Sequence, residues 1–283
     1  MSDIITEALL EMHFHRAIIQ HFESIYGANF LRLLKPSSQQ EAWVGFDQGW
    51  IHTTLSNQEL FDELRQAVQS ANISVKDFYL GYFLQFKIVE RILRRSRFMP
   101  ISYTLPYLRA ELSLEPNTRT GLSQHETLLR LSQINNAAVC YACPMFFESD
   151  DIYANPDLDR LRCVDMSSAP SGWATNQRHF AMFQHEFDPT PLWCSEPSRG
   201  KALSFKQWAS PDVGIGPRKL SGQETMDLIK TAVNTVKPTI RELQQQLFPT
   251  ETDMVTRVLP ESFTILKFGS KVRQRETKSA NGG

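Results

Sequence analysis

The predicted fold depends on the segment Tyr79-Leu80-Gly81-Tyr82-Phe83-Leu84-Gln85-Phe86-Lys87-Ile88-Val89. It is too short to span a bilayer and is rich in aromatic and branched residues, so we expect a buried β-strand. Side chains in a strand alternate between two faces. One face of this segment is apolar, whereas the other becomes polar at Gln85 and Lys87. Because a buried, unpaired ammonium is costly, Lys87 should have an anionic partner or lie in a polar cleft.

Candidate anionic groups lie upstream. A second strand is predicted at Glu41-Ala42-Trp43-Val44-Gly45-Phe46-Asp47, after a polar loop at residues 36–40. By the same alternation Glu41, Gly45 and Asp47 share a face, and a glycine within a strand often marks the close approach of a ligand or another backbone. An N-terminal helix supplies a further acid, because Glu11 adjoins an apolar stripe at helical spacing. That stripe consists of Ile5, Leu9, Ile18, Ile19 and Phe22.

These residues resemble the metal-binding core of the PD-(D/E)xK nuclease superfamily. That family has an αβββαβ core in which an Asp ends one strand, an acid-x-Lys ends the next, and a helical Glu often completes the site. The resemblance places Asp47 at the metal-binding aspartate, Lys87 at the catalytic lysine, and Glu11, with Glu7 as the alternative, at the helical glutamate. Gln85 stands where an acid is usual, as in several branches of the superfamily, and it keeps a carbonyl oxygen able to coordinate a hard cation.

The downstream pattern follows the same element order. A capping box at Ser123-Gln124-His125-Glu126 predicts a helix, and residues 136–142 read as a further strand. The resemblance therefore implies an α/β fold with a restriction-endonuclease-like αβββαβ core and a mixed central sheet over residues 1–145. We expect a loop-rich and helical extension over 146–266, with a strand at 178–183 and a helix capped at Ser221, and then a basic disordered tail over 267–283.

The resemblance also implies chemistry. Mg²⁺ or Mn²⁺ prefers oxygen ligands, which Asp47, Gln85, the backbone carbonyl of Phe86 and Glu41 could supply, and the cation would lower the pKa of a bound water. Lys87 could orient that water or stabilise the transition state as a point charge. The implied function is a metal-dependent endonuclease that hydrolyses DNA, and by extension an effector of bacterial anti-phage defence, acting as a homodimer or with a partner subunit of a defence complex.

Four arginines follow the predicted catalytic strand: Arg91, Arg94, Arg95 and Arg97. We expect them to contact the phosphates of DNA, in which case binding weakens steeply with salt. The alternative is a helix end whose cations complement the helix dipole.

Each candidate also has a purely structural interpretation. Asp47 can begin a turn at Gln48-Gly49, Gln85 and Lys87 can form a solvated strand end, and acids such as Glu11 and Glu41 can belong to solvated surface. A second functional hypothesis therefore keeps the nuclease fold without the activity. The protein would then be an adaptor or inhibitor subunit, and Gln85 would mark the loss of catalysis.

Composition favours a globular protein. The chain has 283 residues, of which 41% are hydrophobic and 22% charged, and its net charge is −1. It contains no apolar run long enough for a membrane span and no basic secretion signal at its start, so we expect a cytoplasmic protein without membrane contact.

The cysteines allow two interpretations. Cys140, Cys143, Cys163 and Cys194 could bind zinc and stabilise an interaction module, or they could be ordinary buried thiols. The second is favoured because Cys140 and Cys143 would point to opposite faces of one strand. No local signature supports a nucleophilic pair of cysteine with His125, His179 or His185, and we expect the last two histidines to be structural.

Overall fold

The computed structural model describes residues 5–173, 177–195 and 197–210. The chain divides into two compact units, residues 1–20 with 32–218 and residues 21–31 with 219–283. In the described part of the second unit, the rings of Tyr26 and Phe30 stack with their centroids 5.4 Å apart. The helix expected after Ser221 and the basic tail at 267–283 lie outside the described residues.

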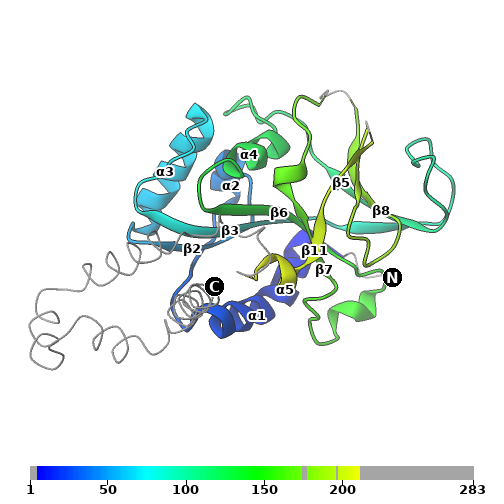
Figure 1. Ribbon diagram of the computed structural model, residues 1–283, viewed down its shortest axis with the longest axis horizontal. Helices are drawn as coiled ribbons and strands as arrows, with labels where there is room; N and C mark the ends of the chain where they lie inside the picture. Colours follow the sequence, from blue (N-terminus) through cyan, green and yellow to red (C-terminus); the bar gives the residue numbers. More distant parts are fainter. Residues whose placement is uncertain (1–4, 174–176, 196, 211–283) are drawn as a thin grey trace, which may run out of the picture. The chain divides into compact units, whose positions relative to one another are not determined.

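A mixed six-stranded sheet, sheet A, is the centre of the first unit (Figure 1). Its strands, in spatial order, are β1 (Arg32–Leu34), β2 (Gln48–Thr53), β3 (Phe78–Phe86), β6 (Ala137–Pro144), β7 (Leu161–Asp165) and β11 (Ala202–Ser204). β3 and β6 run parallel, and every other neighbouring pair is antiparallel. The predicted α/β class with a mixed central sheet is therefore confirmed.

A second sheet, sheet B, has five antiparallel strands. In spatial order they are β10 (Ser198–Arg199), β9 (Leu192–Cys194), β8 (His179–Phe183), β5 (Tyr107–Leu112) and β4 (Val89–Ile92). The strand expected at 178–183 is present as β8. Residues beyond 145 contribute strands to both sheets, so the described part of the expected extension is built into the same sheets as the N-terminal core.

Five helices accompany the sheets in the described ranges: α1 (Glu7–Tyr26), α2 (Ser38–Val44), α3 (Asn57–Ser70), α4 (Gln124–Leu131) and α5 (Phe205–Trp208). Two short 3₁₀ turns span Ser149–Ile152 and Met166–Ser168. In Figure 1, α2, α3 and α4 lie on one side of sheet A, and α5 and the start of α1 lie on the other. The capping box predicted at Ser123 and Glu126 is confirmed at the start of α4.

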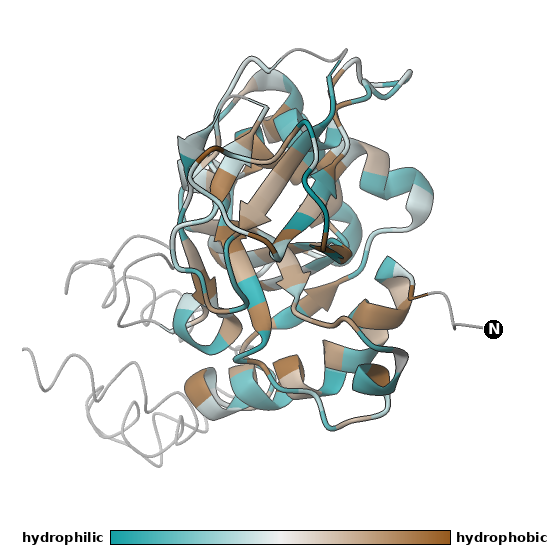
Figure 2. Ribbon diagram, turned by 90° about the vertical axis from the view of Figure 1, so that its right-hand side faces the viewer, coloured by the Kyte–Doolittle hydropathy of each residue, from teal (hydrophilic) through white to brown (hydrophobic). Residues whose placement is uncertain are grey.

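Alternation along β3 separates two apolar layers. Phe83 faces the layer of α2, α3 and α4 and lies in one core cluster with Leu64 and Leu128. Tyr82 faces the other way, where its ring lies 5.4 Å from that of Trp208 in α5. Both β3 residues are fully buried, and in Figure 2 the sheet strands are largely hydrophobic whereas many connecting loops are hydrophilic. The prediction of a buried strand at this position is confirmed.

The segment ending at Asp47 differs from its prediction. Residues 38–44 form helix α2 rather than a strand, because Ser37 and Gln40 make a capping box at its start. Gly45 ends the helix in the left-handed conformation, with φ of 78° and its N–H donating to the carbonyl of Glu41. The shared strand face of Glu41 and Asp47 was therefore a wrong inference, and Gly45 acts as a helix cap.

The predicted strand at 79–89 is also divided. β3 ends at Phe86, and the chain leaves sheet A there and joins sheet B at Val89. The N–H of Lys87 still donates to the carbonyl of Ala142 in β6, at 2.9 Å. Arg91 lies in β4 and the residues that follow form a loop, so the helix-end interpretation of the arginines is wrong.

The cap at Gly45 yields a stability prediction. A Cβ at this position would lie 2.9 Å from Cγ2 of Thr127, whereas a Cβ at Gly121, which also has a positive φ of 69°, would meet nothing within 4 Å. Gly121→Ala should therefore lower the free energy of unfolding by about 1 kcal/mol through backbone strain alone. Gly45→Ala should lower it by about 2–4 kcal/mol, since overpacking adds to the strain. Urea unfolding followed by circular dichroism measures both, and equal losses would contradict the packing part of the argument.

Candidate functional site

The register of β2 and β3 places Asp47 beside Gln85. Gln48 pairs with Leu84 in this antiparallel ladder, so the preceding residue, Asp47, lies opposite Gln85. The N–H of Asp47 donates to the carbonyl of Leu84 at 2.9 Å. In return, Oδ2 of Asp47 accepts from the N–H of Phe86 at 2.7 Å and from Nε2 of Gln85 at 2.9 Å. Three of the residues singled out in the sequence therefore meet at one point.

Gln85 is buried, with 1% of its surface exposed. Its Nε2 also lies 3.3 Å from the carbonyl oxygen of Phe86, to which it donates a second hydrogen bond. Its Oε1 is buried and accepts no hydrogen bond from the residues that the structure describes. An unsatisfied buried acceptor is costly, so Gln85 Oε1 is available to a donor or a cation.

Lys87 has an anionic partner, as its burial required. Its Nζ lies 3.0 Å from Oε1 of Glu7 in α1, and its side chain is 8% exposed against 41% for Glu7. Glu7 was the alternative for the helical glutamate, and it is the acid that contacts the lysine. The ion pair holds the ammonium at the point where the chain passes from sheet A to sheet B.

Glu11 lies one helical turn further on and has different partners. It forms an ion pair with Lys35 and accepts from Nε2 of Gln48 at 3.0 Å. Oε1 of Gln48 in turn accepts from the indole N–H of Trp50 at 3.1 Å. Lys35 and Gln48 were not identified from the sequence. Strand β2 was not predicted, so no alternation indicated where Gln48 and Trp50 point.

Glu41 completes a group of four carboxylates. Its Oε1 accepts from Nε2 of Gln124 at 3.4 Å. Burial raises the pKa of Glu41, while the charge of Lys87 lowers it and that of Glu7 raises it. Glu41 therefore lies near the proposed site although it belongs to a helix rather than to a strand.

The electrostatic centre of this group is Asp47. Burial, as the main cause, raises its pKa to about 7, and the charges of Glu41, Glu11 and Glu7 act in the same direction. The hydrogen bond from the Phe86 N–H opposes them. We name the seven residues Glu7, Glu11, Lys35, Glu41, Asp47, Gln85 and Lys87 the acidic cluster.

The acidic cluster is not a ready-made metal shell of side chains. Within residues 5–173, 177–195 and 197–210, no three His, Cys, Asp or Glu side chains are placed to hold one metal ion. Glu7 and Glu11 are instead paired with lysines. Any cation bound here by Asp47 would need the oxygen of Gln85, the backbone carbonyl of Phe86 or Glu41, together with water.

The four arginines are distributed along β4 and the loop after it. Arg91 lies 3.4 Å from Glu186 and its guanidinium lies 4.5 Å from the ring centre of Phe147. Arg94, Arg95 and Arg97 are exposed.

All four cysteines lie on β-strands, three in sheet A and one in sheet B. Cys140 and Cys143 both belong to β6, so their thiols point to opposite faces, as expected. All four cysteines are free and buried. Burial raises the pKa of the Cys194 thiol to about 11. Burial also raises the pKa of the Cys140 thiol, and this thiol hydrogen-bonds with Cys163.

The histidines considered as nucleophile partners take part in packing. His125 is buried, with its Nδ1 3.2 Å from the hydroxyl of Tyr141 and its Nε2 3.0 Å from the carbonyl of Pro170. The ring of Trp173 stacks between His125, at 4.9 Å, and His179, at 4.4 Å. Nδ1 of His185 accepts from the N–H of Phe187 at 3.3 Å.

The raised pKa of Asp47 predicts how stability depends on pH. Between about pH 4 and pH 7 the folded protein binds a proton at Asp47 that the unfolded chain has released, so stability falls as pH rises through this window. Asp47→Asn cannot ionise and should lose less stability over the same range, in the absence of divalent cations. Urea unfolding at several pH values measures this, with exposed Asp62→Asn as the control. Parallel curves for the wild type and Asp47→Asn would contradict the assignment.

Comparisons with family models, with curated proteins and with solved structures find no match for the chain. Among the helices that the structure describes, none combines the length and the apolar character that crossing a membrane requires. The function is therefore inferred from the acidic cluster and the order of the strands around it.

Proposed function

We propose that the protein is a metal-dependent deoxyribonuclease that hydrolyses a phosphodiester bond at the end of β3. The observation that carries this proposal is the buried carboxylate of Asp47, held against Gln85 and Phe86 and close enough to Glu7, Glu11 and Glu41 for their charges to raise its pKa. Carboxylates gathered beside a lysine are the groups that metal-assisted phosphodiester hydrolysis requires.

The topology supports the same proposal. Helix α1 precedes β1, β2 and β3, which are antiparallel neighbours, and α4 precedes β6, which runs parallel to β3. On this proposal these elements would correspond to the αβββαβ core implied by the resemblance to the PD-(D/E)xK superfamily. On this proposal α2 and α3, and also β4 and β5 of sheet B, are insertions into a restriction-endonuclease-like core.

The residues present fit Mg²⁺ or Mn²⁺. Four groups would hold the cation, each through an oxygen atom: Asp47, Gln85, the backbone carbonyl of Phe86 and Glu41. The unpaired Oε1 of Gln85 and the raised pKa of Asp47 are both features that a bound cation would relieve. When bound, the cation would supply an activated water and offset charge on the scissile phosphate.

The chain's own residues position the reactants. The ion pair with Glu7 fixes the place of Lys87 Nζ at the end of β3. A buried ammonium of this kind stabilises negative charge that develops on a phosphate oxygen. The exposed side chains of Arg94, Arg95 and Arg97 would contact phosphates further along the DNA.

One observation favours the alternative of an inactive adaptor. Glu7 and Glu11 are each satisfied by a lysine, and no three acidic side chains of the described residues form a metal shell. An adaptor would retain the fold through these ion pairs and would bind no divalent cation at Asp47. Metal binding therefore separates the two functions without any need for a substrate.

Cleavage tests the leading proposal. The purified chain should nick supercoiled plasmid or cut single-stranded circular DNA with Mg²⁺ or Mn²⁺. Asp47→Asn or Lys87→Ala should reduce the rate at least about a hundredfold, since each removes a group that acts on the transition state. Lys206→Ala, which removes an exposed cation paired with Asp159, is the control and should leave the rate unchanged. Absence of cleavage of both DNA forms with both metals would count against a nuclease.

Metal binding by calorimetry gives an independent prediction. Because a proton and a cation compete for Asp47, Mn²⁺ affinity should rise by up to about tenfold per pH unit below pH 7 and level off above it. Asp47→Asn should lose this binding and Asp62→Asn should keep it. A wild-type protein that binds no Mn²⁺, or whose binding survives Asp47→Asn, would favour the adaptor.

A further inference from the structure

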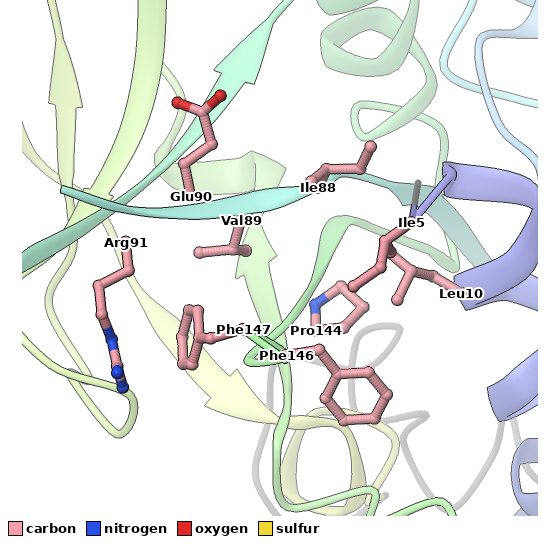
Figure 3. Close-up of a pocket in the computed structure, with 9 residues that line it drawn as sticks. All are labelled: Ile5, Leu10, Ile88, Val89, Glu90, Arg91, Pro144, Phe146 and Phe147. Carbon is pink, nitrogen blue, oxygen red and sulfur yellow. The ribbon is translucent and has the colours of Figure 1, made fainter. Parts of the chain in front are cut away.

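A pocket borders the acidic cluster. It has a volume of about 240 Å³ and is lined by Ile5, Leu10, Ile88, Val89, Glu90, Arg91, Pro144, Phe146 and Phe147 (Figure 3). Its lining includes residues close in sequence to both members of the Lys87–Glu7 ion pair. Ile5 and Leu10 flank Glu7 in the sequence, and Ile88 follows Lys87 directly.

Most of the lining residues are apolar, two of them phenylalanines, and the lining also includes the charged Glu90 and Arg91. In Figure 3, Val89 points toward Phe147, whereas Glu90 points away from the two phenylalanines. The charge of Glu90 is also compensated, because its Oε2 accepts from Arg109 at 2.9 Å. The interior of the pocket therefore offers apolar surface and aromatic rings, with Arg91 along one side.

Arg91 is placed to bind a phosphate at the rim. Its guanidinium lies over the ring of Phe147, which restricts its orientation. Its ion pair with Glu186 spans 3.4 Å between side chains that are 43% and 33% exposed, so it contributes little and can be exchanged for a phosphate. Lys87 and Arg91 are four residues apart, a reach of at most about 14 Å along an extended chain.

We propose that this pocket binds one unstacked nucleobase of the DNA strand next to the bond that is cut. The volume lies below the roughly 300–1,000 Å³ of sites for drug-sized ligands, which suits a single planar ring system. Aromatic walls with an arginine beside them bind bases of single strands through stacking, without requiring one sequence. The inference deepens the proposed function, because it names single-stranded or locally unpaired DNA as the substrate class.

Filling the pocket tests the proposal. Ile88 is 38% exposed, so Ile88→Trp can occupy the pocket with little disturbance of the core, and Leu93→Trp, at a position 69% exposed and outside the pocket lining, is the matched control. Binding of a fluorescent oligothymidine is measured by anisotropy in EDTA, which prevents cleavage. Ile88→Trp should weaken it about tenfold, the loss expected for one stacked base. Leu93→Trp should not.

An abasic oligonucleotide of the same length makes the test specific. It should bind the wild type about tenfold more weakly than oligothymidine does, and Ile88→Trp should weaken it no further. Phe147→Leu, which keeps an apolar side chain but removes the ring, should act as Ile88→Trp does, and its thermal unfolding reports whether it folds. Equal oligothymidine binding by wild type and Ile88→Trp overturns the proposal. A change of oligomeric state in Ile88→Trp, without a change in DNA binding, would assign the pocket to a protein contact instead.

The two proposals fail separately. Cleavage by Ile88→Trp at the wild-type rate and KM would overturn the base pocket and leave the nuclease standing. Base-dependent binding that Ile88→Trp abolishes, in a protein that never cleaves, would leave the pocket standing and overturn the nuclease. A protein with no affinity for either oligonucleotide overturns the base pocket.

Discussion

The rest of the site depends on a carboxylate held in a place where carboxylates are costly. Asp47 directly precedes β2, and the antiparallel register leaves its Oδ2 with two donors from β3, the Phe86 N–H and the Gln85 amide. The hydrogen bond from the Phe86 N–H only partly offsets burial, which raises the pKa of Asp47 to about 7. The backbone ladder that builds sheet A is thus also what keeps the acid in place.

The end of β3 is the second constraint. A strand buried on both faces has no room for an unpaired ammonium, and the chain resolves this by leaving sheet A at Lys87 and entering sheet B two residues later. The pairing of its N–H with Ala142 continues for that one residue, while its side chain meets Glu7. The same transition brings the Lys87 side chain into contact with α1 and places Ile88 and Val89 in the lining of the neighbouring pocket. One change of sheet therefore produces both the polar cluster and the apolar pocket.

Alternation predicted β3 well because both of its faces are decided by the hydrophobic effect. The need for an anion at Lys87 followed from the same alternation, and Glu7 meets it. The segment before Asp47 was misjudged because an apolar pattern as short as Trp43 to Phe46 fits a helix as well as a strand. The capping box of Ser37 and Gln40 was the local signal that favours the helix, and Ser56 with Glu59 marks α3 in the same way.

The position of Glu41 could not be derived from strand alternation, because Glu41 lies in a helix. Its place in the acidic cluster follows instead from the packing of that helix. Glu41 lies one turn before the Gly45 cap, and α2 packs beside α4, whose Gln124 donates to it. Lys35 and Gln48 were missed because their partner, Glu11, lies in α1, and a contact across such a distance in sequence leaves no local pattern. Tertiary packing, and not propensity, decides these three side chains.

The formal charges of the acidic cluster explain why its parts belong together. Glu7, Glu11, Glu41 and Asp47 supply four carboxylates, and Lys35 and Lys87 supply two ammonium groups. Because Glu7 and Glu11 are paired with the lysines, the excess of two charges falls on Glu41 and Asp47, and burial raises the pKa of both, that of Asp47 to about 7. Protonation removes one unit of that excess, and a divalent cation would remove two and satisfy Gln85 Oε1 as well. A neutral acceptor in place of Asp47 would avoid this cost, whereas on the proposed function the cation would offset it.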